Sequence, residues 1–199
     1  MKLEDFQWSR LESREVFRCS IFRVREEPHT HPRIERPVAF SVLESNDWVN
    51  VIAIDRDSVR DPDARLLWVR QYRVGSERVT LEIPGGGCSH EDASPTDSGR
   101  RELIEETGAS ASRWIHLGSV NPNPAIFRNR VHTCLALGCR IDPNAVLGDG
   151  SEVLAPEWRP YRERYRILLE GDVDHALVFS AFALLDAHLT EATEIGRTL

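Results

Sequence analysis

The sequence predicts an α+β fold in which several β-strands are combined with a few helices. Short runs of β-branched and aromatic residues recur through the first two thirds of the chain, one helix pattern follows a glycine-rich turn, and the last quarter has helical spacing of apolar residues. Strands and helices do not alternate regularly, so a doubly wound parallel sheet is not favoured. A chain of 199 residues with 41% hydrophobic content can bury one main core and carry a small extra lobe.

The first half of the chain is expected to be mostly β-strand. Alternating apolar and polar residues predict a strand over 16–24, and three prolines predict a connection over 26–37. Further strand patterns cover 38–43, 48–55, 66–74, 78–83, 114–120 and 131–137. The strands over 48–55 and 66–74 are expected to pair at the centre of the sheet.

Three helices are predicted. The first begins at Ser94 and Pro95, a cap followed by a first-turn proline, and ends at Gly108. Leu103 and Ile104 on this helix are expected to face the core. Apolar residues at spacings of three and four predict further helices over 158–169 and 174–189.

Charge and cysteine content limit the partners. A formal net charge of -7 argues against nucleic acid, which requires a basic patch. Four isolated cysteines suit a reducing compartment, so the cytoplasm is expected. The charged N-terminus does not resemble a signal peptide, and no stretch is expected to approach the roughly 20 apolar residues of a membrane span.

Three glutamates on the first helix predict a metal site. An α-helix turns by about 100° per residue, so Glu102 and Glu106 lie about 40° apart and Glu105 lies about 60° to the other side of Glu102. Three glutamates alone are also typical of a solvated helix face, but carboxylates this close repel one another unless a cation lies between them. Mg²⁺ prefers oxygen ligands and shares them with substrate phosphates. Arg101, four residues before Glu105, is expected to pair with it and orient it.

These residues resemble the Nudix box. Its second half, Arg-Glu-aliphatic-any-Glu-Glu-any-Gly, is matched by Arg101, Glu102, Leu103, Glu105, Glu106 and Gly108. The first half departs from the pattern, because Ala93, or Asp92 in the alternative count, stands where a glutamate belongs. We expect Glu91 or Asp92 to replace that glutamate. The resemblance implies the Nudix fold, with mixed β-sheets sandwiched between helices, and a main-chain carbonyl of Gly85 or its neighbour in the metal shell.

The segments 69–73 and 81–86 resemble the branch of the family that hydrolyses ADP-ribose and nucleoside diphosphate sugars. This branch implies a β-rich N-terminal segment over 1–45 that forms homodimers, followed by a Nudix domain over 46–199. Arg70 and Arg73 are candidates for phosphate binding, although arginines on a strand are also ordinary surface residues. The other substrate-binding candidates are Glu82, Trp48 and Pro124. Trp48 is also a candidate for core packing or the dimer surface.

The resemblance implies that water attacks one phosphorus of the pyrophosphate in the presence of Mg²⁺, with Mn²⁺ as an alternative. The general base is expected to be Glu105, Asp149 or Glu152, with Glu152 favoured. His116 and His132 are expected to be packed, neutral histidines rather than catalysts. Two alternatives stay open. In the first, the protein is a binding or sensing module without hydrolysis. In the second, it is a Nudix hydrolase of GDP-mannose, a dinucleoside polyphosphate or NADH.

Overall fold

A computed structural model describes residues 2–148 and 153–194 of the chain. The chain divides into two compact units, a smaller one of 1–46 with 121–130 and a larger one of 47–120 with 131–199. A single division after residue 45 was predicted from the sequence. The segment 121–130, which that prediction assigned to the second domain, belongs to the smaller unit.

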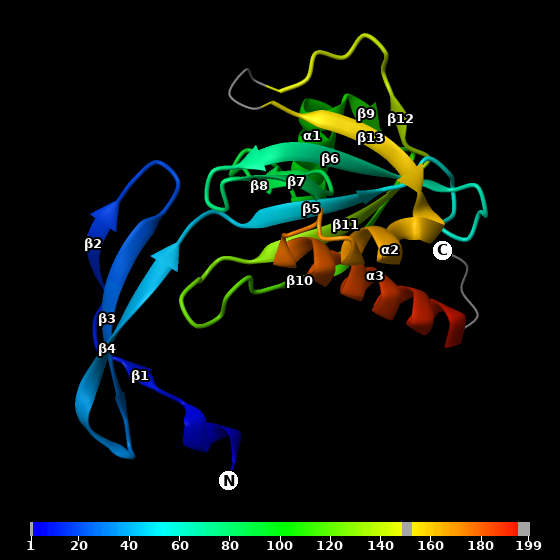
Figure 1. Cartoon of the computed structure of the whole chain (residues 1–199). Coiled ribbons are helices and arrows are strands. Elements are labelled where there is room, and N and C mark those ends of the chain that lie inside the picture. Colours follow the sequence, from blue (N-terminus) through cyan, green and yellow to red (C-terminus); the bar gives the residue numbers. More distant parts are fainter. Residues whose placement is uncertain (1, 149–152, 195–199) are drawn as a thin grey trace. The chain divides into compact units, whose positions relative to one another are not determined.

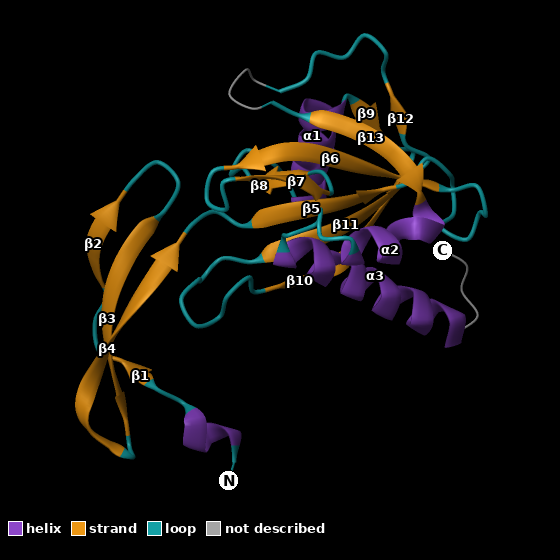
Figure 2. Cartoon of the chain, viewed as in Figure 1, coloured by secondary structure: helices purple, strands orange, loops and turns teal. Residues whose placement is uncertain are grey.

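The smaller unit is one antiparallel sheet of four strands, with a short 3₁₀ helix (Leu3–Phe6) before them (Figure 2). The central strand β3 (Arg23–His31) pairs with β1 (Ser9–Arg10), β2 (Arg14–Arg18) and β4 (Ile34–Glu44).

Two predictions for this unit were wrong. The segment 16–24 is not one strand, because the chain turns where the Cys19 amide donates a hydrogen bond to Phe22 O at 3.0 Å. The segment 26–37 is mostly strand despite its prolines. Pro28 is accommodated because it lies between the part of β3 that pairs with β2 and the part that pairs with β1.

The larger unit contains two main sheets. The first has the strand order β10-β11-β5-β8, the second has the order β13-β6-β7, and β12 and β9 form a separate ribbon. The strands are β5 (Trp48–Ala53), β6 (Arg65–Arg73), β7 (Arg78–Glu82), β8 (Gly85–Gly87), β9 (Ala109–Ser110), β10 (Arg113–Val120), β11 (Val131–Leu137), β12 (Arg140–Ile141) and β13 (Ala155–Pro160). The strands predicted over 48–55 and 66–74 are present, but their predicted pairing was wrong. They lie in different sheets and share one bridge, between Ile54 and Leu66.

The sheets lie between two layers of helices, with α1 (Pro95–Thr107) on one side and α2 (Arg164–Leu169) and α3 (Ala176–Glu194) on the other (Figure 1). Alternate residues of β5 divide between the two layers, because successive side chains of a strand point to opposite faces. Val51 packs in the cluster of Leu103 from α1, whereas Ile52 packs in the cluster of Phe182 and Leu185 from α3. The predicted arrangement of mixed sheets between helices is confirmed.

The predicted ends of α1 are confirmed. The Ser94 hydroxyl accepts a hydrogen bond from the Asp97 amide at 3.2 Å, and Gly108 adopts a φ of 67° at the C-terminal end. The prediction that Ile104 faces the core was wrong. Ile104 is 53% exposed, whereas Leu103 is fully buried.

The helix predicted over 158–169 was wrong in its first part. Trp158 lies in β13 and pairs with Leu67 of β6, and the chain becomes helical only at the 3₁₀ turn Tyr161–Glu163 that precedes α2.

The helix α3 meets the length and composition of a membrane span over Ala176–Thr193, contrary to the expectation that no stretch would. A core helix of a soluble protein can pass the same test, and α3 contributes Val178, Ala181, Phe182 and Leu185 to the cluster against the sheets.

Candidate active site

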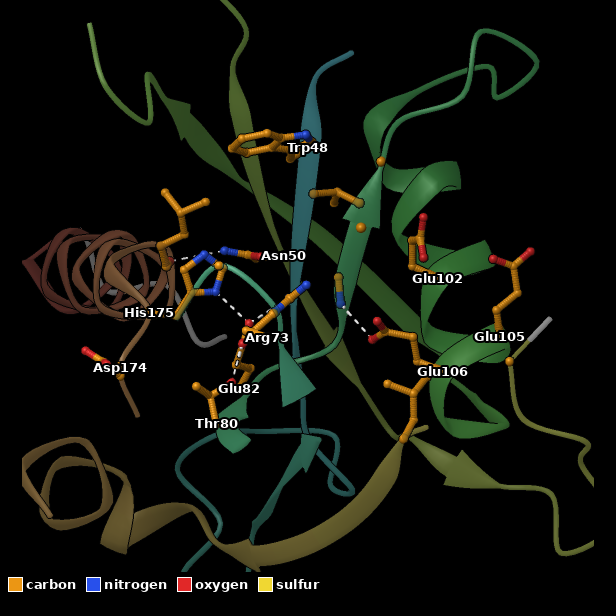
Figure 3. Close-up of a pocket in the computed structure, with 18 of the residues that line it drawn as sticks. Trp48, Asn50, Arg73, Thr80, Glu82, Glu102, Glu105, Glu106, Asp174 and His175 are labelled. Carbon is orange, nitrogen blue, oxygen red and sulfur yellow. Dashed lines mark hydrogen bonds and ion pairs between the residues drawn. The ribbon is translucent and has the colours of Figure 1, made fainter. Parts of the chain in front are cut away.

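A pocket of about 920 Å³ opens in the larger unit between α1, β5, β8 and the start of α3. Figure 3 shows the glutamates of α1 on one side and Arg73, Glu82 and His175 on the other. Among the described residues, five of the lining side chains are carboxylates and one is an arginine; the carboxylates are Glu82, Glu102, Glu105, Glu106 and Asp174. A surface of this composition favours cations over a bare polyphosphate.

The glycine strand β8 lies directly against two of the glutamates. The Gly85 amide donates a hydrogen bond to Glu106 Oε2 at 2.9 Å. A Cβ atom added to Gly86 would lie 2.5 Å from Cδ of Glu102, so only glycine leaves room for that carboxylate. Glu102 and Glu106 are both held on the side of α1 that faces β8 (Figure 3).

Arg101 joins the helix to the loop before it. Its Nη1 donates to Glu102 Oε1 and Glu105 Oε2, both at 2.9 Å, and its Nη2 donates to Gly87 O at 2.7 Å. The predicted pairing of Arg101 with Glu105 is confirmed. Burial would lower the pKa of Arg101, but the charges of Glu102 and Glu105 outweigh it and raise the pKa.

The three glutamates differ in their surroundings. Glu106 is 5% exposed and the side chain of Glu102 is 13% exposed, whereas the side chain of Glu105 is 51% exposed. Among residues 2–148 and 153–194, no group of three or more His, Cys, Asp or Glu side chains is already gathered as a metal site. In this structure the Arg101 guanidinium lies between the carboxylates of Glu102 and Glu105, and the divalent metal ion expected there stays a prediction.

Asp92 occupies the place of the missing box glutamate. Its carboxylate accepts hydrogen bonds from Arg101 Nε and Nη2 at 3.3 Å and from the Ser89 amide at 3.3 Å. Glu91 is exposed, and its amide donates a hydrogen bond to Ser89 Oγ at 3.1 Å within the loop. The sequence left these two residues as alternatives, and the contacts select Asp92 as the link between the loop and α1.

The opposite wall centres on the buried carboxylate of Glu82. Arg73 donates Nε to Glu82 Oε1 at 2.8 Å and Nη2 to Oε2 at 2.9 Å. Thr80 Oγ1 lies 2.6 Å from Glu82 Oε1, and His175 Nδ1 lies 2.6 Å from Glu82 Oε2. Burial alone would raise the pKa of Glu82, but these hydrogen bonds outweigh it and hold the pKa well below its usual range. Glu82 thereby fixes Arg73 and His175 at the pocket wall.

Trp48 and Asn50 belong to β5 and line the same pocket (Figure 3). They are two residues apart, so their side chains share one face of the strand. Asn50 donates Nδ2 to Leu177 O at 3.1 Å, which ties this strand to the start of α3. Trp48 supplies an aromatic surface to the pocket.

Other sequence candidates lie elsewhere. Arg70 pairs with Glu157 at 3.1 Å and Asp172 at 3.3 Å and is not among the described residues that line the pocket. It is three positions from Arg73, which places the two side chains on opposite faces of β6. Pro124 lies in the smaller unit, on its exposed loop. Asp149 and Glu152 lie outside the described residues.

Several lining residues were not predicted from the sequence, among them Asn50, Thr80, Asp174 and His175. Asn50 is a polar residue inside a run of apolar strand residues, which is a signal of a functional position. His175 is separated from Glu82 by 93 positions, and only the folded chain brings them together.

Comparisons with known proteins agree with this geometry. Residues 49–181 match the family model described as the NUDIX domain. A curated ADP-ribose pyrophosphatase of Mycobacterium tuberculosis (strain ATCC 25618 / H37Rv) is 26% identical over 130 residues, which are 65% of this chain and 63% of that protein. The alignment thus spans less than two thirds of that relative. A crystal structure of an ADP compounds hydrolase matches with a TM-score of 0.78 at 22% identity and covers 93% of this chain and 95% of its own.

Proposed function

Because the chain belongs to the Nudix family, we propose that it is a divalent-metal-dependent hydrolase of ADP-ribose or a related nucleoside diphosphate sugar. The products would be a nucleoside monophosphate and a sugar phosphate. One observation carries the proposal. The carboxylates of Glu102 and Glu106 are packed against the glycines of β8 inside a pocket large enough for such a substrate.

The donor chemistry of the site fits a divalent metal. The pocket wall on α1 consists of carboxylate oxygens beside a glycine backbone, and oxygen ligands are those that Mg²⁺ and Mn²⁺ accept in proteins. We assign Glu102, Glu105, Glu106 and the backbone at Gly85 as the residues that would hold it. A bound divalent ion supplies charge neutralisation for the pyrophosphate and a more acidic water.

The chain's own residues divide into positioning and binding roles. Arg101 orients Glu102 and Glu105 through the two bonds from its Nη1. Glu82 holds Arg73 at the pocket wall, where its guanidinium can bind phosphate oxygens. Among the residues that the structure describes, Glu105 is the candidate for the general base, because its carboxylate is accessible and lines the pocket. Glu152 stays a candidate from the sequence.

The nucleotide part of the substrate would be bound by Trp48. An indole ring at the wall can stack on an adenine base, and the related pyrophosphatase is named for an adenine-containing substrate. GDP-mannose, dinucleoside polyphosphates and NADH share the same phosphate chemistry, so they form the comparison set for the assay.

The test is a substrate panel with the purified full chain and Mg²⁺, scored by release of nucleoside monophosphate. We expect ADP-ribose to give the highest kcat/KM. Glu106→Gln should lower turnover by orders of magnitude without unfolding the chain, and Glu191→Gln, an exposed position on α3, is the matched control. Tight ADP-ribose binding without any turnover in the wild-type protein would support the alternative of a binding module, and near-normal turnover in Glu106→Gln would remove the metal assignment.

We also propose that the protein is a homodimer through its smaller unit. No apolar side chain of 2–46 or 121–130 is buried, and large apolar residues are exposed there, including Phe6, Leu11, Phe17, Ile21 and Ile34. An apolar surface of this kind is typical of a protein interface, and a second copy of the same sheet would cover it.

The four cysteines are all unpaired in the structure, which supports a cytoplasmic location.

A further inference from the structure

Two histidines on neighbouring strands of the larger unit face each other outside the pocket. Nε2 of His116 on β10 lies 3.2 Å from Nδ1 of His132 on β11. The two ring centroids are 5.4 Å apart, and the ring planes are inclined by 43°. The two strands are antiparallel, and the direct partner of His116 in the sheet is Cys134. The register shifts between His116 and Gly118, which brings His116 towards His132.

A carboxylate fixes the tautomer of one ring. Nε2 of His132 lies 3.4 Å from Oδ2 of Asp47, so the proton of His132 belongs on Nε2, where it can be donated to Asp47. The lone pair of His132 Nδ1 is then directed at His116. Partial burial, together with the neighbouring His132, lowers the pKa of His116.

The two nitrogens share an N–H···N hydrogen bond, in which His116 Nε2 is the donor when the His132 proton is on Nε2, and their spacing also suits a chelate once His116 carries its proton on Nδ1. Zinc binds histidine nitrogen at about 2.0–2.1 Å in a tetrahedral shell, so two nitrogens on one ion lie about 3.4 Å apart. The separation of 3.2 Å between the two imidazoles is close to that value. A histidine ligand in a metal site also commonly donates its other N–H to a carboxylate, and Asp47 holds that position for His132.

We propose that His116 and His132 form a two-imidazole site for a transition-metal ion such as Zn²⁺, Ni²⁺ or Cu²⁺, with water in the remaining positions. Imidazole ligands select these ions over Mg²⁺, which prefers oxygen. The site is therefore chemically distinct from the carboxylates of α1. His116 is exposed and the side chain of His132 is 15% exposed, so an ion can reach them from solvent.

The site is connected to the pocket through Asp47. The Cys88 amide donates to Asp47 O at 2.7 Å, and Trp48 follows Asp47 and lines the pocket. An ion on His132 would strengthen the bond from His132 to Asp47, because a metallated imidazole is a stronger donor. Occupancy of this site should therefore restrain the start of β5.

The test is calorimetric titration of the full chain with ZnCl₂ in the presence of saturating Mg²⁺, which occupies the carboxylates first. We expect one Zn²⁺ per chain, with affinity reduced at least tenfold in His116→Gln and in His132→Gln. Asp47→Asn should weaken Zn²⁺ binding by about 10-fold. His188→Gln, which removes a histidine from α3, should bind Zn²⁺ as the wild type does.

Two results with the wild-type chain and the single His variants would overturn the proposal. One is the absence of Zn²⁺ binding by the wild-type chain, and the other is unchanged affinity in both His variants. A double variant, Glu102→Gln with Glu106→Gln, separates this site from the proposed function, because it should keep Zn²⁺ binding while losing hydrolysis. Loss of Zn²⁺ binding in that double variant would place the ion on α1 and refute the histidine site. Thermal unfolding of each variant verifies that it is folded.

Discussion

The carboxylate of Glu102 lies against the Cα of Gly86, so closely that a Cβ at that position would be 2.5 Å from Cδ and 2.6 Å from Oε1 of Glu102. The glycine strand and the acidic helix therefore depend on each other. The absence of a side chain at Gly86 is what lets α1 present this carboxylate at the pocket.

Gly86→Ala should impair hydrolysis more than folding. The added methyl group meets the end of a flexible glutamate, which can rotate away at a cost of about 1 kcal/mol or less in unfolding free energy. The rotation moves Glu102 from its position beside β8, so we expect the apparent Mg²⁺ affinity in the activity assay to fall by about 10-fold or more. Gly87→Ala is the matched control, because its added Cβ meets no atom of a described residue within 4 Å other than its own chain neighbours. Equal Mg²⁺ affinity in the two variants would contradict the role given to Gly86.

Asp92→Ala should loosen the loop before α1. The substitution removes the acceptor for Arg101 Nε and Nη2 and for the Ser89 amide. We expect a loss of about 0.5–1.5 kcal/mol in unfolding free energy and a lower kcat. Urea denaturation and steady-state kinetics measure the two effects. Glu91→Ala should change stability by less than about 0.5 kcal/mol, because Glu91 is exposed. A larger effect from Glu91→Ala than from Asp92→Ala would reverse the assignment.

Glu27 should make the smaller unit sensitive to acid. Burial alone would raise the pKa of Glu27, but hydrogen bonds from Arg128 and Ser13 lower the pKa from 4.5 to about 2. A lowered pKa in the folded state means that the stabilisation is complete above about pH 4.5 and is lost as the pH falls towards 2.

The test is urea denaturation at a series of pH values between 6 and 3. It gives the slope of the unfolding free energy against pH. Glu27→Gln should be less stable at pH 6 and show a smaller slope. Glu12→Gln, an exposed position in the same unit, should follow the wild type. A wild-type slope retained in Glu27→Gln would show that other groups cause the acid sensitivity.

Phe17→Asp should weaken the proposed dimer. Phe17 is 53% exposed on a sheet that buries no apolar side chain of its own, and a carboxylate there would be desolvated in an interface. We expect the dissociation constant measured by sedimentation to rise at least tenfold. Val146→Asp changes a residue that is 91% exposed in the larger unit and should leave the dimer intact. A monomeric wild-type protein would refute this part of the proposal.

The sequence predicted the elements whose signals are local. The Ser94 cap, the Gly108 end and the Arg101–Glu105 pair were found because each depends on residues within one helix. The strands over 48–55 and 66–74 were located but wrongly paired, because a buried strand has apolar residues on both faces and its pattern does not specify a neighbour.

The remaining errors have similar causes. Trp158 lies between Pro156 and Pro160 in β13, and apolar spacing alone did not distinguish this strand from the helix that follows it. At the site, the sequence identified the glutamates of α1 but not His175, since a contact across 93 positions leaves no local pattern.

The segment 121–130 joins β10 to β11 yet belongs to the smaller unit, so the backbone passes between the units after residues 46, 120 and 130. Within the smaller unit, Arg128 Nη2 donates to Glu27 Oε2 at 2.7 Å, and the Leu43 amide donates to Ile126 O at 2.8 Å. Deleting the first 46 residues would therefore remove only part of the smaller unit. A shortened chain would keep residues 121–130 without these ionic and backbone partners, so the larger unit can be isolated only if that connection is redesigned as well.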